Sequence, residues 1–206
     1  MRRGRSWTGA CALLIVGAML FRLSVRLGWL QAGPLRWTST DWRAAPWTLW
    51  TAAFASDVPA RALADVLALA ALAVLGRALA APPRDGLALL LAWPLATLSL
   101  ALVPAVQGYA GLSAVVHAAA AVLALRALLR PQSRTLGLLL AGGLLIKLAL
   151  EKAWQAPVGF DGAWGTNVVF AAHLAGACTG AALLLALEAL RPWPSEQGAD
   201  RSHIES

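Results

Sequence analysis

The chain has 206 residues, of which 59% are hydrophobic and only 13% are charged. An ordinary soluble domain has about 25% charged residues, so this composition excludes a typical water-soluble fold. The formal net charge is +7, but the basic residues lie between apolar segments and do not form one patch with interleaved aromatic residues. That distribution argues against a nucleic-acid partner. The sequence therefore predicts an all-α integral membrane protein that contacts the lipid bilayer.

Six apolar segments approach the length needed to cross a hydrocarbon core, about 20 residues at about 1.5 Å each. Glycine and proline residues mark the connections between them. We expect helices near residues 8–30, 60–80, 86–106, 109–129, 134–152 and 166–190. Residues 1–192 would then form one six-helix membrane domain, and residues 193–206 a disordered polar tail in the cytoplasm.

The first apolar segment follows Arg2, Arg3 and Arg5, as in a secretory signal. We expect an uncleaved anchor, because no small-residue cleavage pattern follows. If the N-terminus is cytoplasmic, most arginine residues fall in cytoplasmic segments and few in the outer loops. By the positive-inside rule, this distribution predicts that both termini are cytoplasmic.

The segment 35–57 is too polar to cross a membrane and is rich in tryptophan. Indole side chains favour the headgroup zone, so we expect a loop at the membrane surface. It has two interpretations, a simple anchoring loop or a wall beside a path for substrate. The two cysteines, Cys11 and Cys178, lie inside apolar segments and match neither a metal-ligand spacing nor a disulfide framework. We predict that both are small packing residues.

Polar side chains inside the apolar segments are few, and each needs a reason, because a charge at the bilayer centre costs about 2.5 to 3.5 kcal/mol on insertion scales. They are Arg61, Asp65, Ser113, His117, Lys147, Glu151 and His173. Lys147 and Glu151 lie four residues apart, which favours an ion pair near the membrane surface. Arg61 and Asp65 have the same spacing, so a salt bridge would satisfy both charges.

Ser113 and His173 are the pair most suited to catalysis. Ser113 would lie about one turn into a helix that begins near Gly108, and His173 lies seven residues after Thr166, about 10 Å along its own helix. At similar depth, an imidazole can take the serine proton and produce a nucleophile.

Small residues on both segments favour close contact of the two helices: Gly176 and Gly180 on one, and Ala114 and Ala118 on the other. Each of these features also has a simpler explanation. The serine hydroxyl could bond to its own helix, His117 could fill a polar gap, and the glycines could serve packing alone.

These residues resemble the motifs of a known family. Gly111-Leu112-Ser113-Ala114 is similar to the Gly-x-Ser-Gly motif of rhomboid intramembrane serine proteases. The segment from Ala172 to Gly180 is similar to their His-x-x-Gly-x-x-x-Gly helix. The stretches 109–117, 47–51 and 147–151 more closely resemble rhombosortases. Together these similarities cover roughly residues 35 to 185.

The resemblance implies a six-transmembrane-helix rhomboid-like bundle in the inner membrane of a bacterium, with its active site toward the outer face. Ser113 would be the nucleophile and His173 the base, and His117 would replace an aromatic residue that stacks on the base. A rhombosortase would cleave a C-terminal Gly-Gly-containing sorting tail from a membrane-anchored protein substrate. This chemistry requires no metal ion and no other cofactor.

The chain departs from the family pattern at two places. Arg61 and Asp65 stand where the family usually has the histidine and asparagine that support the oxyanion, and Ala114 replaces a glycine. In a second interpretation of this pair, Arg61 donates to the oxyanion, with Asp65 orienting its guanidinium and the Ser113 N–H as the other donor. Two functions remain open, a serine endopeptidase or a catalytically weak or inactive rhomboid-like pseudoprotease that binds membrane-anchored clients. A channel or carrier ranks third, because the sequence lacks paired broken helices and repeated rings of charge.

Overall fold

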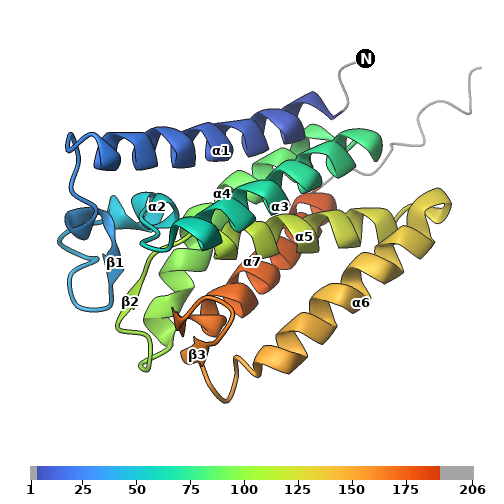
Figure 1. The fold of residues 1–206 in the computed structure, drawn as a ribbon. Coiled ribbons are helices and arrows are strands. Elements are labelled where there is room, and N and C mark those ends of the chain that lie inside the picture. The colour runs from blue at the N-terminus through green and yellow to red at the C-terminus, as the bar shows by residue number, and fades with distance from the viewer. Residues whose placement is uncertain (1–3, 191–206) are drawn as a thin grey trace, which may run out of the picture.

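The computed structural model describes residues 4–190, and helices account for 69% of it. The long helices are α1 (Arg5–Arg26), α3 (Pro59–Ala78), α4 (Pro83–Ser99), α6 (Arg134–Glu151) and α7 (Phe170–Ala189) (Figure 1). Four of them, α3, α4, α6 and α7, pack against α5 (Ser113–Leu128), and α1 packs against α3 and α4. Proline begins α3 and α4, where its missing N–H costs no helical hydrogen bond. The predicted polar tail, residues 193–206, lies outside the described residues, as do Arg2 and Arg3 before the predicted anchor.

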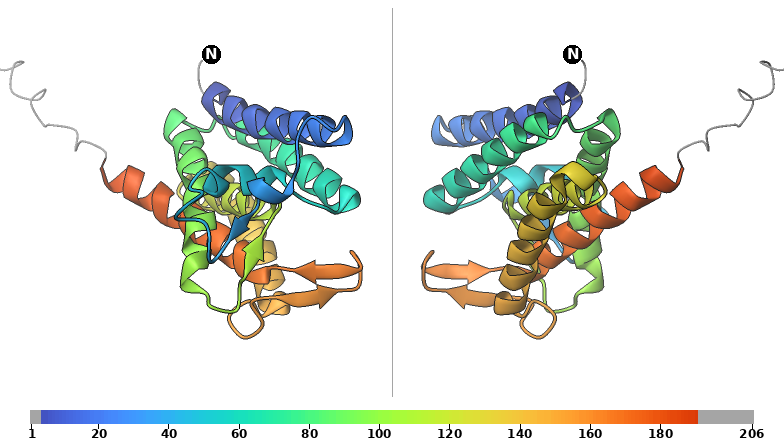
Figure 2. Two further views of the ribbon diagram at one scale, coloured as in Figure 1. Left: turned by 90° about the vertical axis from the view of Figure 1, so that its left-hand side faces the viewer. Right: turned by 90° about the vertical axis from the view of Figure 1, so that its right-hand side faces the viewer.

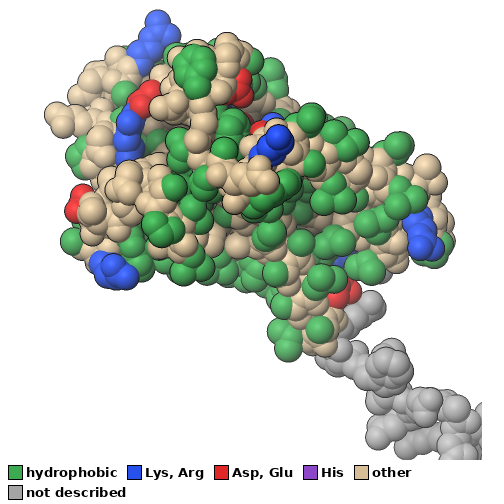
Figure 3. All heavy atoms as spheres, turned by 90° about the horizontal axis from the view of Figure 1, so that it is seen from below, with side chains coloured by type: hydrophobic (Ala, Val, Ile, Leu, Met, Phe, Trp, Pro, Cys, Tyr) green, Lys and Arg blue, Asp and Glu red, His purple; other side chains and the backbone are tan. Residues whose placement is uncertain are grey.

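The described part contains five helices that are long and apolar enough to cross a membrane, and these indicate a membrane protein. They are Arg5–Arg26, Pro59–Ala78, Pro83–Leu102, Pro131–Glu151 and Phe170–Ala189. The sixth apolar helix, α5, has only 16 residues, which corresponds to about 24 Å. In the view of Figure 3, hydrophobic side chains cover much of the surface and charged side chains are few and scattered. Such a surface is suited to contact with lipid.

The shorter elements lie in the connections. They are α2 (Thr48–Thr51), the 3-10 helices Gly33–Leu35, Ala52–Phe54, Leu100–Leu102 and Pro131–Ser133, and the strands β1 (Trp37–Thr38), β2 (Gly108–Tyr109), β3 (Gly159–Asp161) and β4 (Thr166–Val168). β1 pairs antiparallel with β2, and β3 with β4. The β3–β4 hairpin projects from the side of the bundle (Figure 2). The prediction of an all-α fold is therefore correct for the bundle and wrong for these connections.

Two predicted helix starts are wrong. The helix expected from residue 109 begins at Ser113, because Gly108 and Tyr109 form a strand and Gly111 adopts a φ of 144°. The helix expected from residue 166 begins at Phe170, because Thr166 belongs to β4. His173 is therefore in the first turn of α7, about 4.5 Å from its start and not about 10 Å. Both candidate side chains still lie at the beginning of their helices.

α5 forms the centre of the bundle, and 12 of its 16 residues are buried. Its closest neighbour is α7. An ideal Cβ placed on Gly180 would lie 2.6 Å from the carbonyl oxygen of Ala118, and one placed on Gly176 would be closer still to that of Ala114. The predicted close approach of the two helices through small residues is confirmed. Because the two contacts follow the same order along both helices, α5 and α7 run in the same direction.

The tryptophan-rich segment 35–57 is more ordered than a simple surface loop. Trp37 is fully buried in a cluster with Tyr109, whereas Trp47 and Trp50 are half exposed. The indole N–H of Trp93 on α4 donates to the carbonyl oxygen of Trp50 at 2.9 Å. The segment is thus fixed to the bundle beside β2, the strand that leads to Ser113. The cysteine prediction is correct for buried Cys11 and wrong for Cys178, whose side chain faces away from the bundle.

A buried charge cluster joins three helices at the end of the bundle where α5 and α7 terminate. Arg126 of α5 donates three hydrogen bonds to Asp85 of α4, at 3.1, 2.9 and 2.6 Å, and one to Glu188 of α7 at 2.6 Å. Asp85 is fully buried. Paired in this way, the charges tie the helices together at the end opposite Ser113.

Candidate active site

Ser113 is the first residue of α5 and lies at the end of a strand–turn–helix unit. The N–H of Gly111 donates to the carbonyl oxygen of Ala52 at 2.9 Å, which fixes the turn against the segment before α3. Leu112 and Ser113 are both buried. The first N–H groups of a helix have no intrahelical acceptor. Among the described residues no hydrogen bond uses the N–H of Ser113, so this group can bind an oxyanion.

Tyr109 holds the turn in shape. Its hydroxyl donates to the carbonyl oxygen of Gly111 at 2.5 Å and accepts from the N–H of Ala114 at 3.1 Å. The sequence motif contains this tyrosine, but sequence reasoning gave it no role. Burial raises the pKa of Tyr109 to about 12. The phenol therefore stays protonated and keeps donating at every physiological pH.

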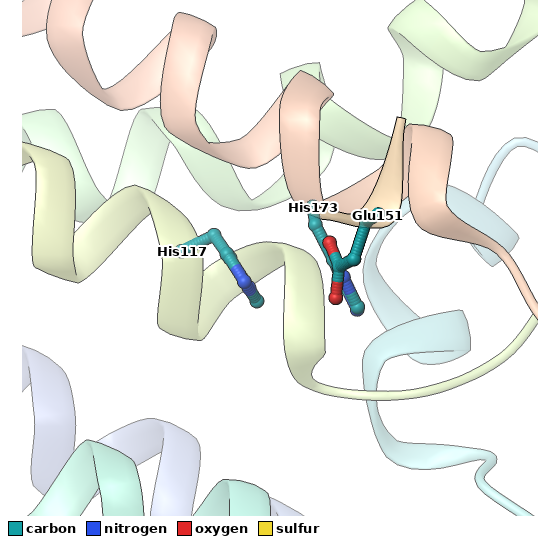
Figure 4. Close-up of side chains that lie close together, drawn as sticks. All are labelled: His117, Glu151 and His173. Atoms are coloured by element: carbon teal, nitrogen blue, oxygen red, sulfur yellow. The ribbon is translucent and has the colours of Figure 1, made fainter. Parts of the chain in front are cut away.

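His173 projects from the first turn of α7 toward α5. Its ring stacks on that of His117, with centroids 4.1 Å apart and planes inclined by 7° (Figure 4). The edge of Phe170 contacts the same ring, with centroids 6.2 Å apart. His117 thus occupies the stacking position that the family resemblance assigned to it. The two contacts hold the plane of the His173 ring between α5 and the start of α7.

The hydrogen-bond partners assign the protons on both rings. Nδ1 of His117 lies 2.7 Å from the carbonyl oxygen of Ser113, and Nδ1 of His173 lies 2.8 Å from Oε2 of Glu151. A carbonyl and a carboxylate oxygen only accept, so both Nδ1 atoms carry hydrogen. Nε2 of a neutral His173 then presents a lone pair. That atom is buried and has no hydrogen-bond partner in the part of the chain that the structure describes. Its lone pair is therefore free to accept a proton, as a general base requires.

Arg61 reaches the serine from the first turn of α3. Its Nη2 donates to Oγ of Ser113 at 3.3 Å, and both side chains are buried. Since the guanidinium uses a lone pair of Oγ, the hydroxyl hydrogen is directed to another acceptor, and the Tyr109 hydroxyl lies within hydrogen-bonding range of this side chain. A positive group at this position also favours negative charge on or beside Oγ.

Asp65 does not pair with Arg61. The described residues show no ion pair between them, and Oδ2 of Asp65 is buried without a hydrogen-bond partner. The predicted salt bridge is therefore wrong, as is the expectation that Asp65 orients the guanidinium. The physical reason is that the Ser113 hydroxyl takes the place of the carboxylate as the acceptor for Arg61.

The predicted ion pair between Lys147 and Glu151 is confirmed, with Nζ 2.6 Å from Oε1. Sequence reasoning missed the other half of this contact, in which the second carboxylate oxygen holds His173. The available signal was an acidic residue at the end of an apolar helix, just before the connection to the histidine helix. The sequence could not show that α6 ends beside the start of α7.

The imidazoles of His117 and His173 and the carboxylate of Glu151 also form a possible ligand set, with ligand atoms within 4.8 Å of one another. Metal binding by both histidines needs ring lone pairs that converge. The lone pairs lie in the ring planes, and these planes are stacked nearly parallel. Both Nδ1 atoms are already engaged in hydrogen bonds. This arrangement fits a proton-transfer site and does not fit a metal centre.

A cavity of about 550 Å³ lies beside the serine turn. Its lining includes Arg61, Tyr109, Ala110 and Val169, together with residues of the segment 35–57 and of the β3–β4 hairpin. Ser113 and His173 are not among its lining residues, and the cavity adjoins them through Arg61 and the turn that precedes Ser113.

The site thus brings together Ser113, His117, His173, Arg61 and Glu151, all singled out from the sequence. It adds the contact of Glu151 with His173 and the role of Tyr109. Gly176 and Gly180 hold the two helices in contact behind it. No hydrogen bond joins Ser113 to His173 among the described residues. The resemblance to rhomboid proteases rests on the motifs alone: no protein-family model, no curated protein and no solved structure matches this chain.

Proposed function

We propose that the protein is an intramembrane serine endopeptidase of the rhomboid type, closest to the rhombosortases. The observation that carries this proposal is a buried serine at the start of α5 next to a buried imidazole whose Nε2 has no partner and whose Nδ1 is bound to a carboxylate. A hydroxyl, a base and a group that orients the base are the elements of nucleophilic acyl transfer.

In the proposed reaction, Oγ of Ser113 attacks the carbonyl carbon of a peptide bond while His173 Nε2 takes the hydroxyl proton. The N–H of Ser113 and the guanidinium of Arg61 stabilise the oxyanion. The tetrahedral intermediate collapses when His173 gives the proton to the leaving amine. Water then attacks the acyl-enzyme with His173 as base, which releases the acid product and regenerates the serine.

The proposed setting is the cytoplasmic membrane of a bacterium, with both termini cytoplasmic and the site toward the outer face. The substrate class is a membrane-anchored protein with a C-terminal sorting tail. The cavity beside Arg61 and the turn that precedes Ser113 supports this choice, because it lies between the connections at one end of the bundle, where a tail emerging from the membrane and water could both arrive.

The experiment is cleavage of a reporter that ends in a Gly-Gly motif, an apolar helix and a basic cluster, in proteoliposomes with the purified protein. The parent should release the reporter, and Ser113→Ala and His173→Ala should not. Ser99→Ala is a matched control, because among residues 4–190 this serine side chain bonds only to a carbonyl of its own helix, and it should cleave like the parent. Cleavage that survives Ser113→Ala would show that the proposed nucleophile is wrong.

A rhomboid-like pseudoprotease that binds clients without cutting them is the second candidate. The observation that favours it is that the hydroxyl of Ser113 bonds to Arg61 and not to His173. In this case the parent retains the intact reporter, and co-purification of the two proteins is unchanged in Ser113→Ala. The same experiment thus separates the two functions.

A further inference from the structure

We propose that Glu151 is a positioning residue for His173, so that the site operates as a triad of Ser113, His173 and Glu151. The inference rests on the proposed protease function and concerns how its base is held. The side chains of Lys147, Glu151 and His173 form a continuous chain, in which Lys147 Nζ is 2.6 Å from one Glu151 oxygen and His173 Nδ1 is 2.8 Å from the other.

The geometry restrains the carboxylate from both sides. Glu151 is the last residue of α6, and only 12% of its side chain is exposed. One oxygen is held by an ammonium group and the other by an imidazole. A carboxylate bound at both oxygens keeps its orientation, and so fixes the ring that it contacts.

The hydrogen bond to Glu151 decides which nitrogen of His173 can act as base. The ring contacts with His117 and Phe170 fix its plane, but stacking does not select a tautomer. Nδ1–H bound to the carboxylate leaves the lone pair on Nε2. The same carboxylate stabilises the positive charge that the ring acquires when it takes the serine proton.

A purely structural role would give a different outcome. α6 and α7 make few direct contacts with each other, so the Glu151–His173 bond could serve only to join them. Loss of such a bond would reduce the stability of the fold without a selective effect on the reactivity of Ser113. Reaction rate, ligand affinity and stability must therefore be measured separately.

The test uses a fluorophosphonate on the full-length protein in detergent, with the inactivation rate constant and the inhibitor constant determined separately. Glu151→Gln keeps the size of the side chain and removes its charge. It should lower the inactivation rate constant by about 10- to 100-fold and leave the inhibitor constant unchanged. Lys152→Gln is the matched control, because this neighbouring side chain is exposed, and it should react like the parent.

The outcomes separate the two proposals. If the parent is not labelled at Ser113, the protease function is wrong and this inference falls with it. If the parent is labelled and Glu151→Gln reacts at the parental rate, or loses only thermal stability, the positioning role alone is wrong.

A second measurement does not depend on Glu151→Gln. The chain has three histidines, so ¹⁵N-histidine labelling of the parent gives few signals, which His173→Ala assigns. The inference requires a hydrogen on Nδ1 of His173 and a lone pair on Nε2 above neutral pH. Any other protonation pattern overturns it.

Discussion

The contact between α5 and α7 sets both the stability of the bundle and the geometry of the site, and an added methyl group tests it. A Cβ on Gly180 would lie 2.6 Å from the carbonyl oxygen of Ala118, whereas ordinary van der Waals contact begins near 3.4 Å. In Gly180→Ala the helices must therefore separate locally by about 0.8 Å, within the range of overpacking that costs about 1 to 3 kcal/mol. Gly176→Ala requires a larger shift, because its Cβ would meet the carbonyl of Ala114 more closely.

The same shift should reduce reactivity more than it reduces stability. Gly176 is one turn from His173, and Ala114 directly follows Ser113, so separation at this contact moves the base away from the nucleophile. A misplacement of about 1 Å can cost about 100-fold in rate. We expect Gly176→Ala to lose about 100-fold in fluorophosphonate reactivity and to unfold at lower denaturant than the parent. Gly180→Ala, one turn further from the site, should lose less of both.

Gly142→Ala is the matched control, because nothing lies within 4 Å of its added Cβ. It should unfold and react like the parent or be slightly more stable, since alanine favours a helix more than glycine does. The measurements are equilibrium unfolding in mixed micelles and the labelling rate under conditions in which every variant is folded. If Gly176→Ala matched the parent in both, the close contact of α5 and α7 and its influence on the site would be refuted.

Three further predictions concern the charges and the tyrosine. Arg61→Ala should lower the labelling rate of Ser113 by about 100- to 1,000-fold if the guanidinium supports the oxyanion, and an unchanged rate would exclude that role. Asp85→Asn should cost about 1 to 3 kcal/mol of unfolding free energy, because it removes the fully buried partner of Arg126 and leaves only Glu188 as its counter-charge; a loss below about 1 kcal/mol, typical of exposed pairs, would contradict this. Because burial raises the pKa of Tyr109, the only tyrosine, to about 12, the unfolded chain ionises first and stability should fall as the pH rises from about 10. Tyrosinate absorbance that develops at pH 10 in the folded protein would contradict this prediction.

The sequence predicts the bundle well where the physical signal is local. Apolar length alone locates the long helices, and small residues at helical spacing predict the contact of Gly176 and Gly180 with α5. Helix starts are predicted less well, because Tyr109 and Thr166 lie in short strands. Tyr109 pairs with the distant Trp37, whereas Thr166 pairs with the nearby Asp161 in a hairpin that was not predicted. The pairing of β1 with β2 depends on contacts between residues about 70 positions apart, which no local pattern contains.

In the candidate site, too, the sequence predicts local features and misses contacts between helices. Ser113, His117 and His173 could be selected because polar groups are rare in apolar segments and these carry useful chemistry. Spacing along one helix gave the right partner for Lys147 and the wrong one for Arg61. The difference arises from tertiary structure: both Arg61 and Glu151 contact groups on other helices, the hydroxyl of Ser113 and the imidazole of His173. Patterns within one helix could not show either contact.

The most direct test of the central claim is to identify the residue that a fluorophosphonate modifies. Mass spectrometry of the labelled protein should find one phosphonylated peptide, modified at Ser113, and this adduct should be lost in His173→Ala while the variant remains folded. An adduct on another serine, or an adduct at Ser113 that forms equally fast without the imidazole, would contradict the claim that His173 activates Ser113.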